Sequence, residues 1–187
     1  MEILVGIITL FVVVPIIGII LYIIVMLNKA KQFPLLNFER FFDEKNQTAV
    51  KEIEQLTNKS IKGTKGWILL ATLFMSIYYL LNIWSILFVL LNLFVVAYYN
   101  EFNLSLANIR FCIVLFSLLS ATFTFLDNWL DSKEKSRTFH ENWFKTSVIA
   151  KRFIAKVETI NDFELLCNEV DNMISFMHES IKNTKFL

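Results

Sequence analysis

The sequence predicts an all-α membrane protein with three transmembrane helices, a cytoplasmic helical segment and a C-terminal cytoplasmic helical hairpin. Three apolar runs support this prediction: residues 3–27, 66–100 and 111–126 contain no charged side chain. A helix at the surface of a soluble protein needs a polar face toward water, which these runs lack. Each run is near or above the roughly 20 apolar residues that a membrane-spanning helix needs.

The composition agrees with a membrane protein and gives no sign of an enzyme. The chain is 56% hydrophobic with 19 Phe and a formal net charge of +1, which excludes disorder and gives no signal for nucleic-acid binding. With only four Gly there is no glycine-rich phosphate loop. His140 and His178 lack the close neighbours of a zinc site. We expect no catalytic residue, no metal and no cofactor.

Residues 1–27 predict an N-terminal transmembrane helix whose N-terminus lies outside. A cleaved signal peptide is the alternative interpretation. Glu2 stands where such peptides carry Lys or Arg, and the run is longer than their apolar core. Pro15 and Gly18 lie inside the predicted helix, where membrane helices tolerate them and where they can introduce a kink.

Residues 28–66 predict a cytoplasmic segment with a short amphipathic helix. Eight basic residues lie in this segment between two spans, and such an excess marks the cytoplasmic side. Gly63 and Gly66 are expected to end the amphipathic helix. Its apolar face, read from roughly helical spacing, consists of Phe42, Val50, Ile53, Leu56 and Ile61.

Residues 67–127 predict a transmembrane hairpin. Its first run is too long for one upright crossing, so we expect a tilt or a helix that begins before the bilayer. Trp67 is expected at the inner interface, with Tyr98 and Tyr99 at the outer one, because amphipathic aromatic residues prefer those depths.

The charge distribution supports three spans with a cytoplasmic C-terminus. The outer loop near residues 100–108 carries Glu101 and no Lys or Arg, whereas nine basic residues follow Asp127. A four-span alternative would divide the long run near Asn82. It would place the nine basic residues outside, which the positive-inside rule disfavours.

Polar side chains within the hairpin are the candidate functional residues. They occupy a narrow sector on each of its two helices, at about 100° per residue. Amides in hydrocarbon are costly, so these sectors should face protein or water. They indicate either close helix packing through small residues or a hydrated path built by several subunits, with Asp127 forming a ring of carboxylates. The pore-lining candidates are Asn82, Ser85, Asn92, Ser117, Ser120, Thr124, Asp127 and Asn128.

Residues 128–187 predict two cytoplasmic helices with a heptad seam on the first and similar spacing on the second. The two seams either bury each other in an antiparallel hairpin or serve subunit assembly and ligand sensing, and both can hold together. The seams consist of Phe139, Trp143, Thr146, Ala150, Phe153, Val157 and Ile160, followed by Phe163, Leu166, Val170, Met173 and Met177. The candidates for oligomerisation or gating are Phe139, Trp143, Phe153 and Val157.

The layout resembles the SLATT family of small membrane effectors over about residues 62–177. The resemblance is carried by a cytoplasmic helix, a close pair of spans, the charged exit at residues 131–135 and a long helix at 137–160. The N-terminal span departs from the usual two-span layout. The resemblance implies a protein of bacterial antiphage systems that forms a pore when a partner nucleotidyltransferase makes a nucleotide or oligonucleotide signal.

We therefore expect an oligomeric, pore-forming ion channel in the bacterial cytoplasmic membrane, gated by a nucleotide signal and disrupting the membrane potential. Two alternatives stay open. One is a non-conducting scaffold or accessory subunit that recruits a partner through its C-terminal helices, and the other is a holin-like lesion former. The expected partners are the lipid bilayer, further copies of the chain and the nucleotide signal.

Overall fold

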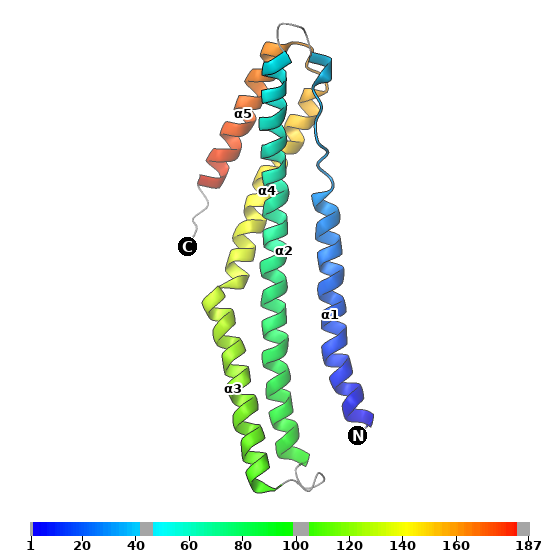
Figure 1. The fold of residues 1–187 in the computed structure, drawn as a ribbon, viewed down its shortest axis with the longest axis vertical. Helices are drawn as coiled ribbons and strands as arrows, with labels where there is room; N and C mark the ends of the chain where they lie inside the picture. Colours follow the sequence, from blue (N-terminus) through cyan, green and yellow to red (C-terminus); the bar gives the residue numbers. More distant parts are fainter. Residues whose placement is uncertain (1, 42–46, 99–104, 183–187) are drawn as a thin grey trace. The chain divides into compact units, whose positions relative to one another are not determined.

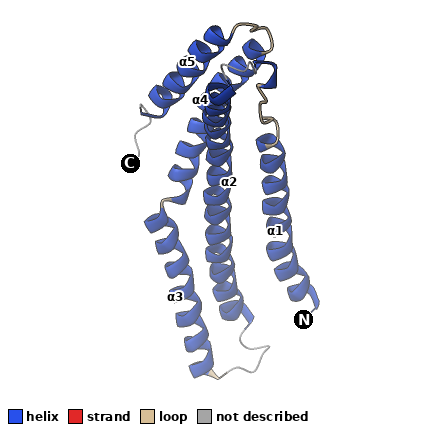
Figure 2. Cartoon of the chain, turned by 45° about the horizontal axis from the view of Figure 1, so that its top comes forward, coloured by secondary structure: helices blue, strands red, loops and turns tan. Residues whose placement is uncertain are grey.

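The computed structural model describes residues 2–41, 47–98 and 105–182, and their regular structure is entirely helical (Figures 1 and 2). This confirms the all-α prediction. Of the predicted residues, Phe42, Tyr99 and Glu101 lie outside the described part of the chain. The helices are α1 (Glu2–Ala30), α2 (Gln47–Tyr98), α3 (Leu106–Leu130), α4 (Ser132–Val157) and α5 (Phe163–Lys182), with a short 3-10 helix at Glu39–Phe41.

The chain divides into two compact units. Unit 1 comprises Met1–Ile24 and Leu73–Lys135, and unit 2 comprises Val25–Thr72 and Ser136–Leu187. Helix α2 contributes its first half to unit 2 and its second half to unit 1.

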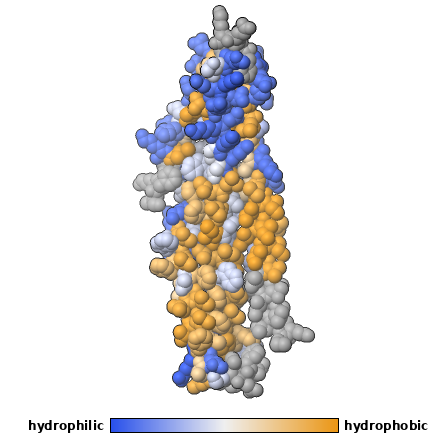
Figure 3. Space-filling view, viewed as in Figure 1, coloured by the Kyte–Doolittle hydropathy of each residue, from blue (hydrophilic) through white to orange (hydrophobic). Residues whose placement is uncertain are grey.

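Three helical stretches are long and apolar enough to cross a membrane: α1, α2 and the stretch that begins with α3. In unit 1 large apolar side chains such as Val14, Leu93, Phe111 and Leu118 are exposed, and apolar residues cover most of the face of this unit seen in Figure 3. So much exposed apolar surface would be unfavourable in water and is compatible with contact to lipid.

Helix α2 runs unbroken for 52 residues, through Gly63, Gly66 and Asn82. The expectation that the two glycines end a short cytoplasmic helix is therefore wrong, and no break near Asn82 divides the long run. Glycine inside a helix costs about 1 kcal/mol relative to alanine, which is a weakening and not a stop signal. Buried residues on both sides of the glycines hold the helix together.

The first half of α2 packs within unit 2 through a buried seam whose spacing alternates between 4 and 3 residues from Thr57 onward. The predicted apolar face was wrong at one position, because Leu56 is 50% exposed while Thr57 is fully buried. A pattern that counts only apolar residues misses threonines that pack through their methyl groups. The buried seam consists of Val50, Thr57, Ile61, Thr64, Ile68 and Ala71.

The C-terminal hairpin of α4 and α5 buries much of its two seams in one core, in line with one of the two interpretations, whereas Phe139, Trp143 and Thr146 are not part of this core. This core of unit 2 also receives aromatic residues from the connection between α1 and α2, namely Phe33, Phe38 and Phe41. Its members from the hairpin are Ala150, Phe153, Val157, Ile160, Leu166, Val170, Met173 and Met177.

Side-chain hydrogen bonds hold the connection between α1 and α2 in place. The Asn58 side-chain amide accepts from the Leu36 N–H and donates to the Leu36 carbonyl, both at 2.9 Å. The Arg40 guanidinium donates to the carbonyls of Val157 and Glu158 at the end of α4. A cation at the C-terminal end of a helix satisfies carbonyls that have no partner within the helix.

Replacing both glycines should strengthen α2. A Cβ atom added at Gly63 or Gly66 meets nothing within 4 Å. Gly63→Ala combined with Gly66→Ala should therefore raise the free energy of unfolding by about 1–2 kcal/mol, because alanine loses less backbone entropy. Urea unfolding in detergent, followed by circular dichroism, measures this change. The reverse exchange at a buried site of the same helix, Ala71→Gly, should lower stability. A double variant less stable than the parent would contradict the unbroken helix.

Candidate functional site

The polar residues predicted on the two helices of the hairpin meet each other within unit 1. The Asn82 Nδ2 donates to Asp127 Oδ2 at 3.0 Å. The Ser85 hydroxyl lies 3.0 Å from that of Ser120 and 2.9 Å from that of Thr124. We call this row the polar seam, and its members are Asn82, Ser85 and Asn92 on α2 with Ser117, Ser120, Thr124 and Asp127 on α3.

At the far end of the seam the side-chain amide of Asn92 lies 2.8 Å from the Ser117 hydroxyl. With its oxygen toward Ser117 and its nitrogen 3.2 Å from the Ile113 carbonyl, both ends of this amide are satisfied. The Ser120 hydroxyl also reaches the Ser85 backbone carbonyl at 3.1 Å. Contact between a side chain and the opposite backbone requires closely spaced helices, which small residues permit.

Aromatic rings stack beside the polar seam. Phe88 of α2 lies 6.0 Å from Phe116 and 5.8 Å from Phe123 of α3, measured between ring centroids. Trp84 extends the stack, with its ring 6.4 Å from that of Phe123. The two helices are therefore held by hydrogen bonds along one line and by ring contacts along a neighbouring one.

One edge of the polar seam is open. Ser117, Thr124 and Asn128 are exposed, although Ser117 and Thr124 each hydrogen-bond within the hairpin. The second carboxylate oxygen of Asp127, Oδ1, is buried and has no hydrogen-bond partner. The hydroxyl and amide oxygens at this open edge can replace part of the hydration shell of a cation.

The structure thus joins seven of the eight pore-lining candidates and leaves Asn128 at the exposed edge. Sequence analysis predicted that the two polar sectors face protein or water. In the structure they pair with each other inside one chain, so helix packing accounts for most of their hydrogen bonds. What remains for water or for another copy of the chain is the open edge.

The candidates for oligomerisation or gating lie inside unit 2. Phe153 and Val157 are buried in its core. Phe139 stacks on Trp67 of α2, with 5.7 Å between ring centroids. The Trp143 ring lies 5.8 Å from the Lys29 Nζ. The seam of α4 is therefore used for packing within the chain.

Large apolar side chains are also exposed on the hairpin of α4 and α5. They lie outside the two heptad seams, so the sequence analysis did not identify them. They are Phe144, Leu165 and Phe176. His140 lies on α4, with its ring centroid 5.2 Å from that of Trp143. Burial and the nearby Lys29 ammonium lower the pKa of the His140 imidazole.

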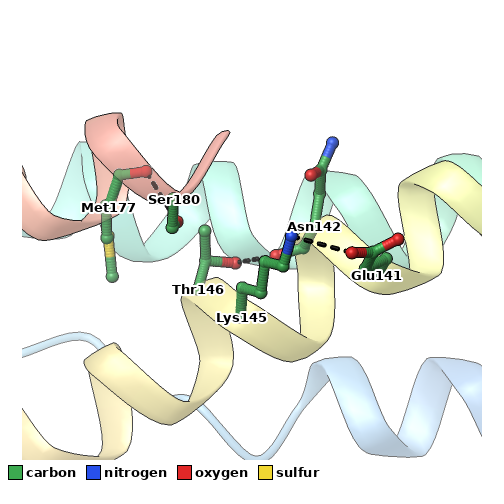
Figure 4. Close-up of polar contacts among 6 residues, drawn as sticks. All are labelled: Glu141, Asn142, Lys145, Thr146, Met177 and Ser180. Atoms are coloured by element: carbon green, nitrogen blue, oxygen red, sulfur yellow. Dashed lines mark hydrogen bonds and ion pairs between the residues drawn. The ribbon is translucent and has the colours of Figure 1, made fainter. Parts of the chain in front are cut away.

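The packed face of α4 contains a fully buried asparagine, Asn142, that the sequence analysis did not identify. The predicted heptad seam includes the neighbouring Trp143 instead. Asn142 is 0% exposed, and neither atom of its side-chain amide has a hydrogen-bond partner. Figure 4 shows Thr146 one turn later, whose hydroxyl donates to the Asn142 backbone carbonyl at 2.8 Å. The neighbouring Glu141–Lys145 ion pair stands on the exposed side of the helix. A buried amide without partners is unfavourable in the folded state.

Two cavities in unit 2 are lined by residues of both α4 and α5. One, of about 600 Å³, lies between α4 and α5 and is lined by Arg152, Lys156, Glu169, Asn172 and Phe176 among others. Lys156 and Glu169 form an ion pair across it.

The other cavity, of about 410 Å³, lies among α2, α4 and α5. Gly63 and Gly66 form part of its wall, with Thr146, Met177 and His178 opposite. Because no side chain covers the glycines, α2 presents bare backbone there.

No group of three or more His, Cys, Asp and Glu residues within the described ranges is placed to hold a metal ion. No protein-family model, curated protein or solved structure matches this chain.

The pairing of Asn82 with Asp127 should appear as coupling between the two positions. Asn82→Ala and Asp127→Ala should each destabilise the hairpin by about 1–3 kcal/mol, because each leaves a polar partner unpaired. The double variant should cost less than the sum, by about 0.5–3 kcal/mol. Unfolding in mixed detergent micelles measures all three. Asn128→Ala, outside the paired row, is the control and should change little. Additive effects would show that the two side chains do not interact.

Replacing Asn142 with an apolar residue of similar branching should stabilise unit 2. Asn142→Leu removes the unpartnered amide and should raise the free energy of unfolding by about 1–3 kcal/mol. Thermal unfolding in detergent gives the comparison, with Thr146→Val as the matched control on the same face. A loss of stability in the leucine variant would mean that the amide is satisfied in the native protein.

Proposed function

We propose that this protein is a homo-oligomeric, ion-conducting membrane effector with unit 1 as its transmembrane part. The observation that carries the proposal is the open edge of the polar seam. Ser117, Thr124 and Asn128 are exposed on a helix whose other exposed side chains are mostly apolar. Polar groups facing hydrocarbon are unfavourable, so this edge calls for water or another copy. Several copies around a central axis would supply both.

Asp127 gives the proposed path its charge. One carboxylate oxygen is held by Asn82 and the other has no hydrogen-bond partner. Repeated by symmetry, this group becomes a ring of carboxylates at one mouth of the path. Such rings concentrate cations and repel anions. The proposed conductance is therefore cation-selective, and opening it would dissipate the membrane potential.

The proposed topology has the N-terminus outside the bacterial cytoplasmic membrane, with the α1–α2 connection and the C-terminal helices inside. This topology rests on the positive-inside rule, because Lys and Arg are concentrated in residues 28–65 and in the tail after Asp127. Unit 2 would then lie in the cytoplasm, where a signal made during phage infection is accessible.

We assign the signal to the cavity between α4 and α5. Arg152 and Lys156 supply positive charge for phosphate groups, and Phe176 offers a ring that is 59% exposed for stacking with a base. Asn172 adds donors and acceptors for a base edge. These groups suit a nucleotide or oligonucleotide made by a partner nucleotidyltransferase, and binding would compete with the Lys156–Glu169 ion pair.

A second candidate function is a non-conducting membrane scaffold. It is favoured by the pairing of the two polar sectors within one chain, which needs neither water nor a second copy along most of its length. Phe144 and Phe176 would then be the contacts to a recruited partner. Ion flux separates the two functions, because a scaffold gives none.

Flux through liposomes should depend on the polar seam and not on polarity elsewhere on α3. Thr124→Leu should lower the flux strongly, whereas Thr122→Leu should leave it near the parent level. Thr122 is also exposed, and like Thr124 it donates to the carbonyl four residues earlier in its own helix, but Thr124 in addition lies 2.9 Å from the Ser85 hydroxyl of α2. Asp127→Asn should reduce the cation-to-anion ratio read from reversal potentials. Flux is measured with and without added cyclic and linear nucleotides. If the intact protein gives no ion flux either with or without nucleotides, the result would favour the non-conducting scaffold.

A further inference from the structure

We propose that the inner lipid-headgroup layer meets the chain at the end of α3, and that residues 67–72 of α2 stand outside the bilayer. The partner of this surface is the phosphate and glycerol layer of a phospholipid membrane. Its contact residues, which we call the interfacial band, are Tyr78, Tyr79, Trp129, Lys133 and Lys135. The inference needs unit 1 to be in a membrane, and it does not depend on ion conduction.

Trp129 marks the band on α3. Its side chain is 71% exposed, more than any other large apolar side chain from residue 13 onward whose exposure the structure describes. Tryptophan and tyrosine concentrate at membrane interfaces because their rings are apolar and their N–H or O–H groups are polar. Tyr79 is likewise exposed on α2. Between Arg110 and Trp129, Asp127 is the one charged residue of α3.

Two lysines bring positive charge to the same level of unit 1. The Lys133 Nζ lies 5.8 Å from the centroid of the Tyr78 ring, and the Lys135 Nζ lies 5.8 Å from that of Phe74. Lysine side chains lie along apolar surface and hold their ammonium groups in the headgroup region. The rings of α2 and the ammonium groups that follow α3 therefore define one level, where apolar surface gives way to charge.

Helix lengths agree with an interface at this level. Residues 73–98 of α2 extend about 39 Å, and the 25 residues of α3 about 37 Å, at 1.5 Å per residue. Both suit a hydrocarbon core of about 30 Å with its interfacial regions. A span that began at Trp67 would extend about 48 Å, which exceeds this thickness.

Packing within unit 2 covers part of the apolar surface of residues 67–72. Trp67 stacks on Phe139, and Ile68 and Ala71 are fully buried. The Ser136 hydroxyl donates to the Ala71 carbonyl at 2.8 Å. Trp67, Ile68 and Ala71 thus pack within unit 2, whereas Leu69 and Leu70 remain exposed. The expectation that Trp67 lies at the inner interface is replaced by Trp129.

Two matched positions on α2 test the inference. Leu69 is 44% exposed and Val89 is 47% exposed, and 20 residues of continuous helix separate them. Each is changed to cysteine in a background without Cys112 and Cys167, and the full chain is reconstituted in phosphatidylcholine–phosphatidylglycerol vesicles. A water-soluble maleimide should modify Leu69→Cys at least about tenfold faster than Val89→Cys, because the reactive thiolate needs water. Equal, slow rates would place Leu69 in hydrocarbon and overturn the inference.

Fluorescence quenching tests Trp129 directly in the same vesicles. In variants that retain one tryptophan, Trp129 should be quenched best by a nitroxide near the headgroup and Trp84 by a nitroxide deep in the acyl chains. Quenching of Trp129 mainly by the deep probe would also overturn the inference. Both measurements require only insertion, so a protein that shows this depth pattern and no flux would refute the proposed conductance alone.

Discussion

Helix α2 is continuous across both units, and its length sets the conditions for the rest of the structure. Its 52 residues extend about 78 Å, far more than a bilayer core of about 30 Å can cover. A bilayer could therefore cover only part of this helix. The first half buries Ile61, Thr64 and Ile68 within unit 2, whereas large apolar side chains of the second half such as Leu90 and Leu93 are exposed.

The two halves of α2 are held by different forces, as their surroundings require. Between helices in lipid there is little hydrophobic driving force, so in the proposed membrane part hydrogen bonds and close contact must hold α2 to α3. Ser85, Ser120 and Thr124 provide both. Unit 2 is instead stabilised by burial of apolar side chains such as Phe153 and Leu166. There the unpartnered amide of Asn142 opposes the packing that surrounds it.

Much of the fold could be predicted from the sequence because its strongest signals are long. Apolar runs and the 3- and 4-residue spacing of α4 and α5 extend over many residues, and the hairpin core follows from them. Local signals were less reliable. Gly63 and Gly66 suggested a helix end because a glycine near a change in composition commonly marks one. Thr57 and Asn142 were overlooked because burial of a polar residue depends on what packs against it. The polar seam was visible as two sectors, but one sequence does not say whether they pair within a chain or between chains.

The row of hydrogen bonds within unit 1 also restricts how α2 and α3 can slide along each other. Asn82 bonds to Asp127, and Ser85 bonds to Ser120 and Thr124, so these pairs belong to one register of the two helices. A slide by one residue moves a helix by about 1.5 Å, and the side chain that replaces the original one points about 100° away. Such a slide would separate all of these partners at once. The polar seam therefore acts as an alignment mark that sets the height of α3 beside the second half of α2.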